Sequence, residues 1–421
     1  MNAVFLAIVL ISFAVAALRE LTGLADAPVM DALGMAMIDA AKGSVELAIG
    51  LVGVMALFLG LMKVAEAGGL LVIIARVLRP AMTRLFPDVP PDHPAMGAMV
   101  LNMSANALGL GNAATPFGIR AMQALESLNP RPGVATDSMA LFLAINTSSV
   151  TLLPTGVIAL RASAGSLDPA GIVPTTLFAT ICSTTVAIVT AKLLARYWSQ
   201  PEAVATAGVP QVDAAERGWQ DATGDGDAEA ALTRDVGEGY PTWVSLAVFA
   251  CVLAIVPLSI LYGSIIAPWI IPGLMVTLLG FGALRGVAVY ETFVEGAKAG
   301  FEVALRIIPY LVAILVAVAM FRASGAMELV VGPLGAVTAM IGLPADALPM
   351  ALLRPLSGSG AYGILAATIE NPAIGPDSYV GYLVSTIQGS TETTFYVLAV
   401  YYGAVQIRRF QHTLVAALLA A

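Results

Sequence analysis

The chain has 421 residues, of which 58% are hydrophobic and only 11% are charged. An average soluble domain carries about 25% charged residues, so this composition excludes an ordinary soluble enzyme. Residues 201–240 hold nine acidic side chains against two arginines and so supply −7 of the net charge of −8, which leaves no basic stripe for nucleic acid.

Long uncharged runs in the chain predict membrane-spanning helices. A helix needs about 20 apolar residues to cross the hydrocarbon core. Five runs contain no Asp, Glu, Lys or Arg: 1–18, 94–119, 138–160, 169–191 and 239–284. The last is long enough for two spans with a turn near Tyr262. The first lacks a basic leading segment, which favours a retained span over a signal peptide.

Shorter apolar runs are interrupted by single charges, glycines or prolines. They cover 47–62, 307–321, 329–345, 355–369, 378–391 and 393–407. Broken backbone at membrane depth is tolerated only where protein or a water-filled cavity satisfies its polar groups. We therefore expect an all-α polytopic membrane protein with about ten membrane segments, some of them discontinuous or re-entrant helices.

Four features recur in the same order in the two halves of the chain. Residues 41–48 align without a gap to 297–304, and Lys and Glu stand four apart in both. Segment 101–112 matches 353–363, an Asp-Ser pair opens a later apolar run in each half, and 146–151 matches 388–393. Many transporters consist of two such repeats. The pattern predicts a first repeat at 1–199, an acidic solvent-exposed linker at 200–240 and a second repeat at 241–421.

We expect the two repeats to have inverted topology. Whether they are inverted or parallel depends on whether 94–119 crosses the membrane or re-enters. The basic residues that flank the spans are too evenly distributed to orient the chain by the positive-inside rule.

Two stretches carry a resemblance to known proteins. The run HPAMGAMVLNMSANALGLGNAATP at 93–116, with INTSS at 145–149, resembles spore maturation protein A. The run STIQGSTETTFY at 385–396, with YYG at 401–403, resembles spore maturation protein B. The chain therefore resembles a fusion of the two, in which each half is a nucleoside-recognition or gate domain. That domain is also similar to the membrane parts of ferrous-iron transport protein B and of concentrative nucleoside transporters.

The resemblance implies transport but does not name the solute. We expect secondary, ion- or proton-coupled transport of a small polar solute, nucleoside-like or a small organic ion, at a midplane site between the repeats. The alternatives are a membrane scaffold or accessory subunit in envelope or spore maturation, and a passive channel. The bacterial inner membrane is the expected location, with the chain crossing it several times.

Polar side chains inside the apolar runs are the candidate substrate-binding residues. In the first repeat they accompany the helix breakers Gly109, Gly111 and Pro116, and breaks at corresponding positions indicate a transport site. The alternative role is to hold helices together by hydrogen bonds. The candidates are Asn102, Ser104, Asn106, Asn112, Asn146, Thr147, Ser148 and Ser149, with Ser357, Ser359, Gln388, Ser390 and Thr391 in the second repeat.

Glu392 is the candidate for the coupling ion, together with Thr393. An ionisable residue within a span indicates function, because its burial costs at least about 2.5 kcal/mol. The alternative is that Glu392 pairs with Arg354 or stays protonated. Glu46, Glu302 and Arg354 are secondary candidates. Each of the two glutamates follows a lysine by four residues, and such pairs usually lie on a surface, but this pair recurs in both repeats.

Other chemistries find little support in the sequence. Gly358–Gly363 reads GSGAYG but lacks the strand, helix and acid of a dinucleotide site. Neither histidine has a partner at metal-ligand spacing, so no metal is expected. We also expect no cofactor and no enzymatic activity. Cys182 and Cys251 lie in apolar runs and are interpreted as small buried hydrophobic residues. The expected partners are the lipid bilayer, the solute, a coupling cation or proton, and further copies of the chain.

Overall fold

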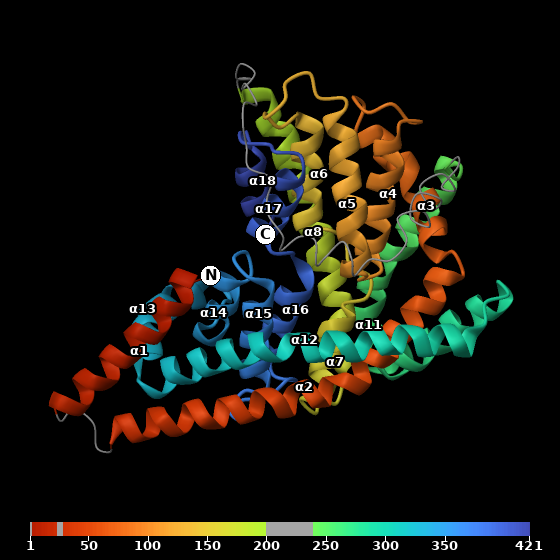
Figure 1. The fold of residues 1–421 in the computed structure, drawn as a ribbon. Helices are drawn as coiled ribbons and strands as arrows, with labels where there is room; N and C mark the ends of the chain where they lie inside the picture. Colours follow the sequence, from red (N-terminus) through yellow and green to blue (C-terminus); the bar gives the residue numbers. More distant parts are fainter. Residues whose placement is uncertain (1, 23–27, 199–238) are drawn as a thin grey trace. The chain divides into compact units, whose positions relative to one another are not determined.

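A computed structural model describes residues 2–22, 28–198 and 239–421, and within these ranges every regular element is helical (Figure 1). An isolated bridge joins Val134 and Arg409. The helices are α1 (Asn2–Thr22), α2 (Val29–Ala67), α3 (Leu70–Leu85), α4 (Pro94–Ala107), α5 (Gly111–Glu126), α6 (Asp137–Thr147), α7 (Thr155–Ser163), α8 (Ile172–Tyr197), α11 (Thr242–Leu284), α12 (Val289–Ala323), α13 (Ala326–Thr338), α14 (Leu348–Leu353), α15 (Gly358–Ile369), α16 (Tyr379–Ser390), α17 (Thr394–Ala404) and α18 (Thr413–Ala420). Short 3₁₀ turns are η1 (Pro169–Gly171), η2 (Ala339–Ile341) and η3 (Ala345–Ala347).

Apolar helices of membrane-spanning length confirm the predicted fold class. Phe5–Thr22, Val29–Ala67 and Pro169–Tyr197 are long and apolar enough to cross a membrane. Thr242–Leu258, Pro268–Leu284 and Ile308–Ala323 are shorter apolar helices. The backbone of α11 leaves the helical conformation at Tyr262, with φ −127° and ψ 16°, which is where the sequence predicts a turn.

The chain folds into two compact units that do not follow the order of the sequence. Unit 1 combines Met1–Val64, Pro154–Thr176 and Gly263–Thr393. Unit 2 combines Ala65–Leu153, Leu177–Tyr262 and Thr394–Ala421. Each unit therefore takes segments from both predicted repeats. The predicted linker lies outside the described residues except for its last two positions.

In unit 2, the uncharged run 94–119 forms a hairpin of two helices. Helix α4 spans only 14 residues, about 21 Å at 1.5 Å per residue, whereas the hydrocarbon core is about 30 Å thick. The chain reverses at Leu108–Leu110, so that the Asn102 side chain on α4 reaches the carbonyl of Ala114 on α5. This geometry favours re-entry over crossing for 94–119.

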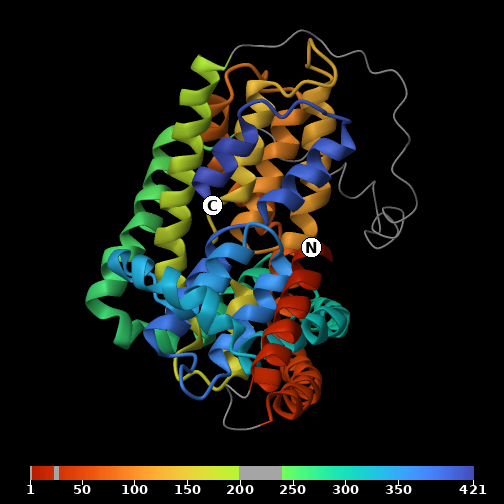
Figure 2. The same cartoon turned by 90° about the vertical axis from the view of Figure 1, so that its left-hand side faces the viewer.

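The rest of unit 2 packs around this hairpin. Helices α4, α5 and α6 stand side by side (Figure 1), and α17 and α18 from the end of the chain pack against α5 and α6 (Figure 2). Met99, Phe142 and Tyr402 belong to one buried apolar cluster. The Tyr402 hydroxyl forms a 2.6 Å hydrogen bond with Thr413, so its polar end is satisfied inside the core.

In unit 1, α2 and α12 cross closely because small residues face each other. A Cβ atom added to Gly300 would lie 2.6 Å from the Cα of Ala56, and one added to Gly296 would lie 2.6 Å from the carbonyl oxygen of Leu59. Small residues four apart on both helices permit this approach, as in membrane helix pairs. The contacts run in opposite sequence directions, so these two corresponding helices are antiparallel where they cross.

The repeat is also visible in local backbone geometry. Gly69 and Gly325, which align at the offset of the repeat, precede α3 and α13 with φ of 83° and 79°. This left-handed conformation costs glycine little because it has no Cβ atom. Thr136 and Ser378 cap α6 and α16 by accepting hydrogen bonds from backbone N–H groups three residues on. The same capping chemistry therefore starts the corresponding helices.

The expectation for the cysteines is wrong. Cys182 on α8 and Cys251 on α11 are both exposed. An apolar run predicts burial away from water, but a membrane helix can face lipid, so an exposed side chain there is compatible with an apolar sequence.

Candidate functional site

Each repeat contains a helix that is interrupted at a polar segment. Helix α6 ends at Thr147 and α7 begins at Thr155, whereas α16 ends at Ser390 and α17 begins at Thr394. The chain passes from one compact unit to the other within each interruption, at Leu153–Pro154 and at Thr393–Thr394. As a result, α6 and α17 belong to unit 2, and α7 and α16 to unit 1.

Other parts of unit 2 satisfy the freed backbone of the first interruption. The N–H of Leu152 donates to the carbonyl of Ala107 at 2.9 Å. The Thr180 hydroxyl accepts from the N–H of Thr151 at 3.4 Å, and the Thr184 hydroxyl donates to the carbonyl of Ser148. Threonines of α8 thus replace helical hydrogen bonds, as the membrane environment requires.

Three of the predicted asparagines form side-chain hydrogen bonds in unit 2. Asn106 Nδ2 donates to Asn146 Oδ1 at 3.0 Å, and Asn146 Nδ2 donates to the carbonyl of Phe142 at 3.0 Å. Asn102 Nδ2 donates to the carbonyl of Ala114 at 2.7 Å and to the Tyr401 hydroxyl at 3.3 Å. The buried Asn102 Oδ1 accepts no hydrogen bond. The structure thus brings Asn106 and Asn146 together and links Asn102 to a tyrosine from the other repeat.

The predicted hydroxyl residues of this repeat bond mainly to their own helices. Ser104 donates to the carbonyl of Val100, and both Thr147 and Ser148 donate to the carbonyl of Ala144. Ser149 is buried, and its carbonyl accepts from the Thr151 hydroxyl. The side chain of Asn112 lies outside the described residues. Because these hydroxyls already donate their hydrogen atoms to the preceding turn, they can only accept further hydrogen bonds.

In the second repeat, the interruption surrounds a buried arginine of unit 1. The Arg354 side chain is only 7% exposed. Its Nη2 donates to the carbonyl of Thr391, and its Nη1 donates to the Thr393 hydroxyl at 3.4 Å. Arg354 Nε is buried and donates no hydrogen bond. The extended backbone of Thr391 turns its carbonyl away from the helical ladder, which makes it available to the guanidinium.

The other candidates of this repeat differ in their surroundings. Ser357 caps α15 by accepting from the N–H of Gly360 at 3.0 Å, whereas Ser359 is exposed. Ser390 donates to the carbonyl of Ile387 in its own helix. Gln388 is 7% exposed, and its Oε1 is buried without a hydrogen bond. Gln388 therefore carries unused hydrogen-bonding capacity.

Glu392 forms a long ion pair with Arg354. Its Oε2 is 3.8 Å from Arg354 Nη2, and its side chain is 54% exposed. The secondary candidates Glu46 and Glu302, and the lysines that precede them, are all exposed on α2 and α12. Glu392 is thus the carboxylate among these three that lies beside a buried cation.

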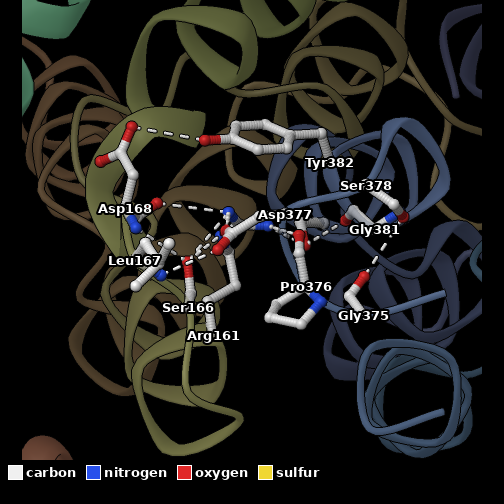
Figure 3. Close-up of polar contacts among 11 residues, drawn as sticks. Arg161, Ser166, Leu167, Asp168, Gly375, Pro376, Asp377, Ser378, Gly381 and Tyr382 are labelled. Atoms are coloured by element: carbon white, nitrogen blue, oxygen red, sulfur yellow. Dashed lines mark hydrogen bonds and ion pairs between the residues drawn. The ribbon is translucent and has the colours of Figure 1, made fainter. Parts of the chain in front are cut away.

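Arg161 on α7, which is not among the residues predicted from the sequence, is also a buried arginine of unit 1 (Figure 3). Its side chain is fully buried, and its Nη2 lies 2.9 Å from Asp377 Oδ1. Its Nη1 donates to the carbonyl of Pro376 at 2.6 Å, and its guanidinium carbon lies 4.2 Å from the centre of the Tyr382 ring. Arg161 therefore joins the segment after α7 to the start of α16.

Asp377 completes this cluster from the side of the second repeat. One carboxylate oxygen accepts from the Ser166 hydroxyl at 2.5 Å and the other from the N–H of Leu167 at 2.8 Å. The Tyr382 hydroxyl donates to Asp168 at 3.3 Å, as Figure 3 shows. A lone arginine directly after a 23-residue uncharged run was the available sequence signal.

Comparison with known proteins agrees with the duplicated architecture. The family described as Gate, nucleoside recognition, matches residues 48–164 and again 304–408, just over half of the chain. Spore maturation protein A of Bacillus subtilis (strain 168) is 49% identical over 148 residues, which are 35% of this chain and 76% of that protein. Spore maturation protein B of the same organism is 47% identical over 150 residues, 36% of this chain and 83% of that protein. No solved structure matches. The Gate family and the spore maturation proteins are not known enzyme families.

Proposed function

The chain belongs to the Gate family, as a membrane protein that joins regions similar to spore maturation proteins A and B, and from this we propose that it transports a small polar solute by a secondary, ion- or proton-coupled mechanism. The family description mentions nucleosides, and that wording belongs to the family. The class of solute is taken up separately below.

The observation that supports transport is the pair of interrupted helices, one in each Gate region. Discontinuous helices at corresponding positions of two repeats form the substrate and ion sites of many transporters. The interruptions at 148–154 and 391–393 have that arrangement. A bundle needed only for support would gain nothing from two such breaks, because each removes helical hydrogen bonds that other groups must replace.

In this proposal each unit has its own polar groups beside the interruptions. The amides of Asn102, Asn106 and Asn146, with the nearby hydroxyls, are the proposed solute ligands of unit 2, and Gln388 is the proposed solute ligand of unit 1. Glu392 and Thr393 bind the coupling cation or proton. Asn106 and Gln388 are the strongest of the amides, because Asn106 is only partly buried and Gln388 retains an unsatisfied oxygen. The bacterial inner membrane is the proposed location.

Uptake into liposomes that contain the purified protein tests the proposal. We expect saturable uptake that depends on a proton or cation gradient. Glu392→Gln keeps the shape of the side chain and removes its charge, so binding of the solute persists while uptake driven by the gradient is lost. Glu291→Gln, at an exposed position in the first turn of α12, is the matched control. Unchanged gradient dependence in Glu392→Gln would remove the carboxylate from the coupling role.

A scaffold or accessory subunit is the second candidate, favoured by the Arg161 cluster and by the asparagines that bond to one another. In that case the polar side chains hold helices together. A scaffold gives no uptake of any solute, and a passive channel gives flux that neither saturates nor responds to a gradient. The same liposomes therefore distinguish all three.

A further inference from the structure

Arg354 is a buried cation with little compensation for its charge. Placing a charged group in an apolar surrounding is costly unless it is paired and hydrogen-bonded. Glu392 is the carboxylate beside it, 3.8 Å away and more than half exposed. Arg161 in the same unit has Asp377 at 2.9 Å. Compared with Arg161, Arg354 thus has the longer ion pair and the more exposed carboxylate.

The guanidinium of Arg354 also keeps unused hydrogen-bond donors. Its contacts are one from Nη1, to the Thr393 hydroxyl, and one from Nη2, to the carbonyl of Thr391. The buried Nε–H has no acceptor. A planar guanidinium binds carboxylates and phosphates through paired N–H groups, so these donors suit an oxyanion.

The amino-terminal end of α15 faces the same point. A Cβ atom added to Gly358 would lie 2.8 Å from Thr393 Oγ1 and 3.5 Å from Arg354 Nη1. The backbone at the first residue of a 12-residue helix, a hydroxyl and the guanidinium therefore converge where glycine has no side chain. Unpaired N–H groups and the dipole at a helix amino terminus both favour negative charge.

We propose that Arg354, Thr393 and the first turn of α15 bind a carboxylate or phosphate group of the solute, which makes the transported solute an anion. This inference rests on the proposed transport function and names the class of its substrate. Glu392 competes with the anion for the guanidinium. A proton or cation that neutralises Glu392 therefore favours binding of the anion. Binding of the coupling ion and binding of the solute are coupled in this way.

Among the residues whose side chains are described, two titratable groups act on the guanidinium. Arg354 interacts electrostatically with Glu392, and with Tyr362 on α15. Without the charge of Glu392, Arg354 has no carboxylate beside it. A variant without the carboxylate therefore binds the oxyanion more tightly than the wild type. A merely structural role for Glu392 predicts no such increase in affinity.

The test measures oxyanion binding to the full chain in lipid nanodiscs, by tryptophan fluorescence and thermal unfolding. Succinate and inorganic phosphate are the two probes for the source of the anion, and sulfate, which keeps a constant charge near neutral pH, is the reference oxyanion. Chloride at equal ionic strength is the background. We expect Arg354→Gln to weaken binding on the order of tenfold or more. Arg285→Gln, at an exposed position, is the matched control.

Glu392→Gln keeps the test decisive if Arg354→Gln does not fold. We expect it to bind sulfate more tightly than the wild type at neutral pH. Absence of oxyanion binding in the wild type, or unchanged affinity in Glu392→Gln, overturns the inference. Liposome uptake separates the two proposals: saturable uptake of a neutral nucleoside but of no anion refutes the anion site alone, whereas Arg354-dependent oxyanion binding without any uptake refutes transport alone.

Discussion

Arg161 and Arg354, both buried in unit 1, have different surroundings. Arg161 has a carboxylate at 2.9 Å, a backbone carbonyl at 2.6 Å and an aromatic ring 4.2 Å from its guanidinium carbon. Arg354 has one backbone carbonyl, one hydroxyl at 3.4 Å and a carboxylate at 3.8 Å. Both are cations in apolar surroundings and the Nε of each is buried without an acceptor, but Arg161 has the shorter ion pair and the larger number of hydrogen-bond partners.

This difference separates a structural role from a binding role. A buried charge whose partners are already in place holds together the segments that supply them. A buried charge whose ion pair is long and exposed is available to a ligand that brings a closer acceptor. Arg161 therefore stabilises the contact between the end of α7 and the start of α16, whereas Arg354 is poised for an anion.

The largest expected effect is on stability, from Arg161→Ala. The change removes a fully buried side chain and leaves Asp377 and the carbonyl of Pro376 without their donor, which together cost about 3–5 kcal/mol. We expect a strongly lowered thermal midpoint and poor recovery of folded protein in size-exclusion chromatography. Arg354→Ala, the matched variant, lowers the midpoint less because Glu392 is hydrated. Equal losses in the two variants would contradict the comparison.

Replacing the two carboxylates gives the next largest effect. Asp377→Asn keeps the shape but leaves a fully buried guanidinium without its counter-charge, at a cost of about 1–3 kcal/mol. Glu392→Gln changes an exposed side chain, so we expect a stability change within about 0.5 kcal/mol. Thermal unfolding of both variants in the same detergent measures the difference. Similar destabilisation by the two would show that Glu392 also has a structural role.

The sequence predicts which residue types form these sites better than it predicts which distant segments contact each other there. The uncharged runs, the turn at Tyr262 and the polar interruptions follow from local composition and period, so they could be predicted. The partner of Arg161 is more than 200 residues away, and no local rule connects α7 with the start of α16. Nor could the sequence reveal that α6 packs with α17 in one unit while α7 packs with α16 in the other.

The outcome at the predicted polar residues has a similar explanation. Asn106 and Asn146 share an apolar setting and meet in the structure. Ser104, Thr147 and Ser148 share the same setting, but their hydroxyls can reach the carbonyls of the preceding helical turn. An amide has both donors and an acceptor to satisfy, so it reaches other helices more readily than a hydroxyl does.

Asn102 extends the comparison to the other repeat, because it aligns with Arg354 in the sequence. Its Nδ2 donates to the Tyr401 hydroxyl at 3.3 Å, a contact that joins two helices of unit 2. Tyr401→Phe removes this acceptor, and hydrogen bonds between membrane helices average about 0.6 kcal/mol. We expect a slightly lower thermal midpoint and unchanged oxyanion binding. A loss of binding would mean that the first repeat contributes to the anion site.

A small effect on stability and the sharpest effect on binding are expected from Gly358→Ala. The added methyl would meet the hydroxyl of Thr393 and a terminal nitrogen of Arg354, both ends of side chains that can shift, so the change in stability stays below about 1 kcal/mol. The methyl nevertheless occupies the space where the oxyanion would contact the guanidinium and the first turn of α15. We expect weaker binding of sulfate and succinate with an unchanged thermal midpoint in their absence. Gly53→Ala, where an added methyl meets nothing within 4 Å, is the matched control. If Gly358→Ala binds oxyanions as tightly as Gly53→Ala does, the anion does not lie at the start of α15, and Arg354 then resembles Arg161 in serving the fold.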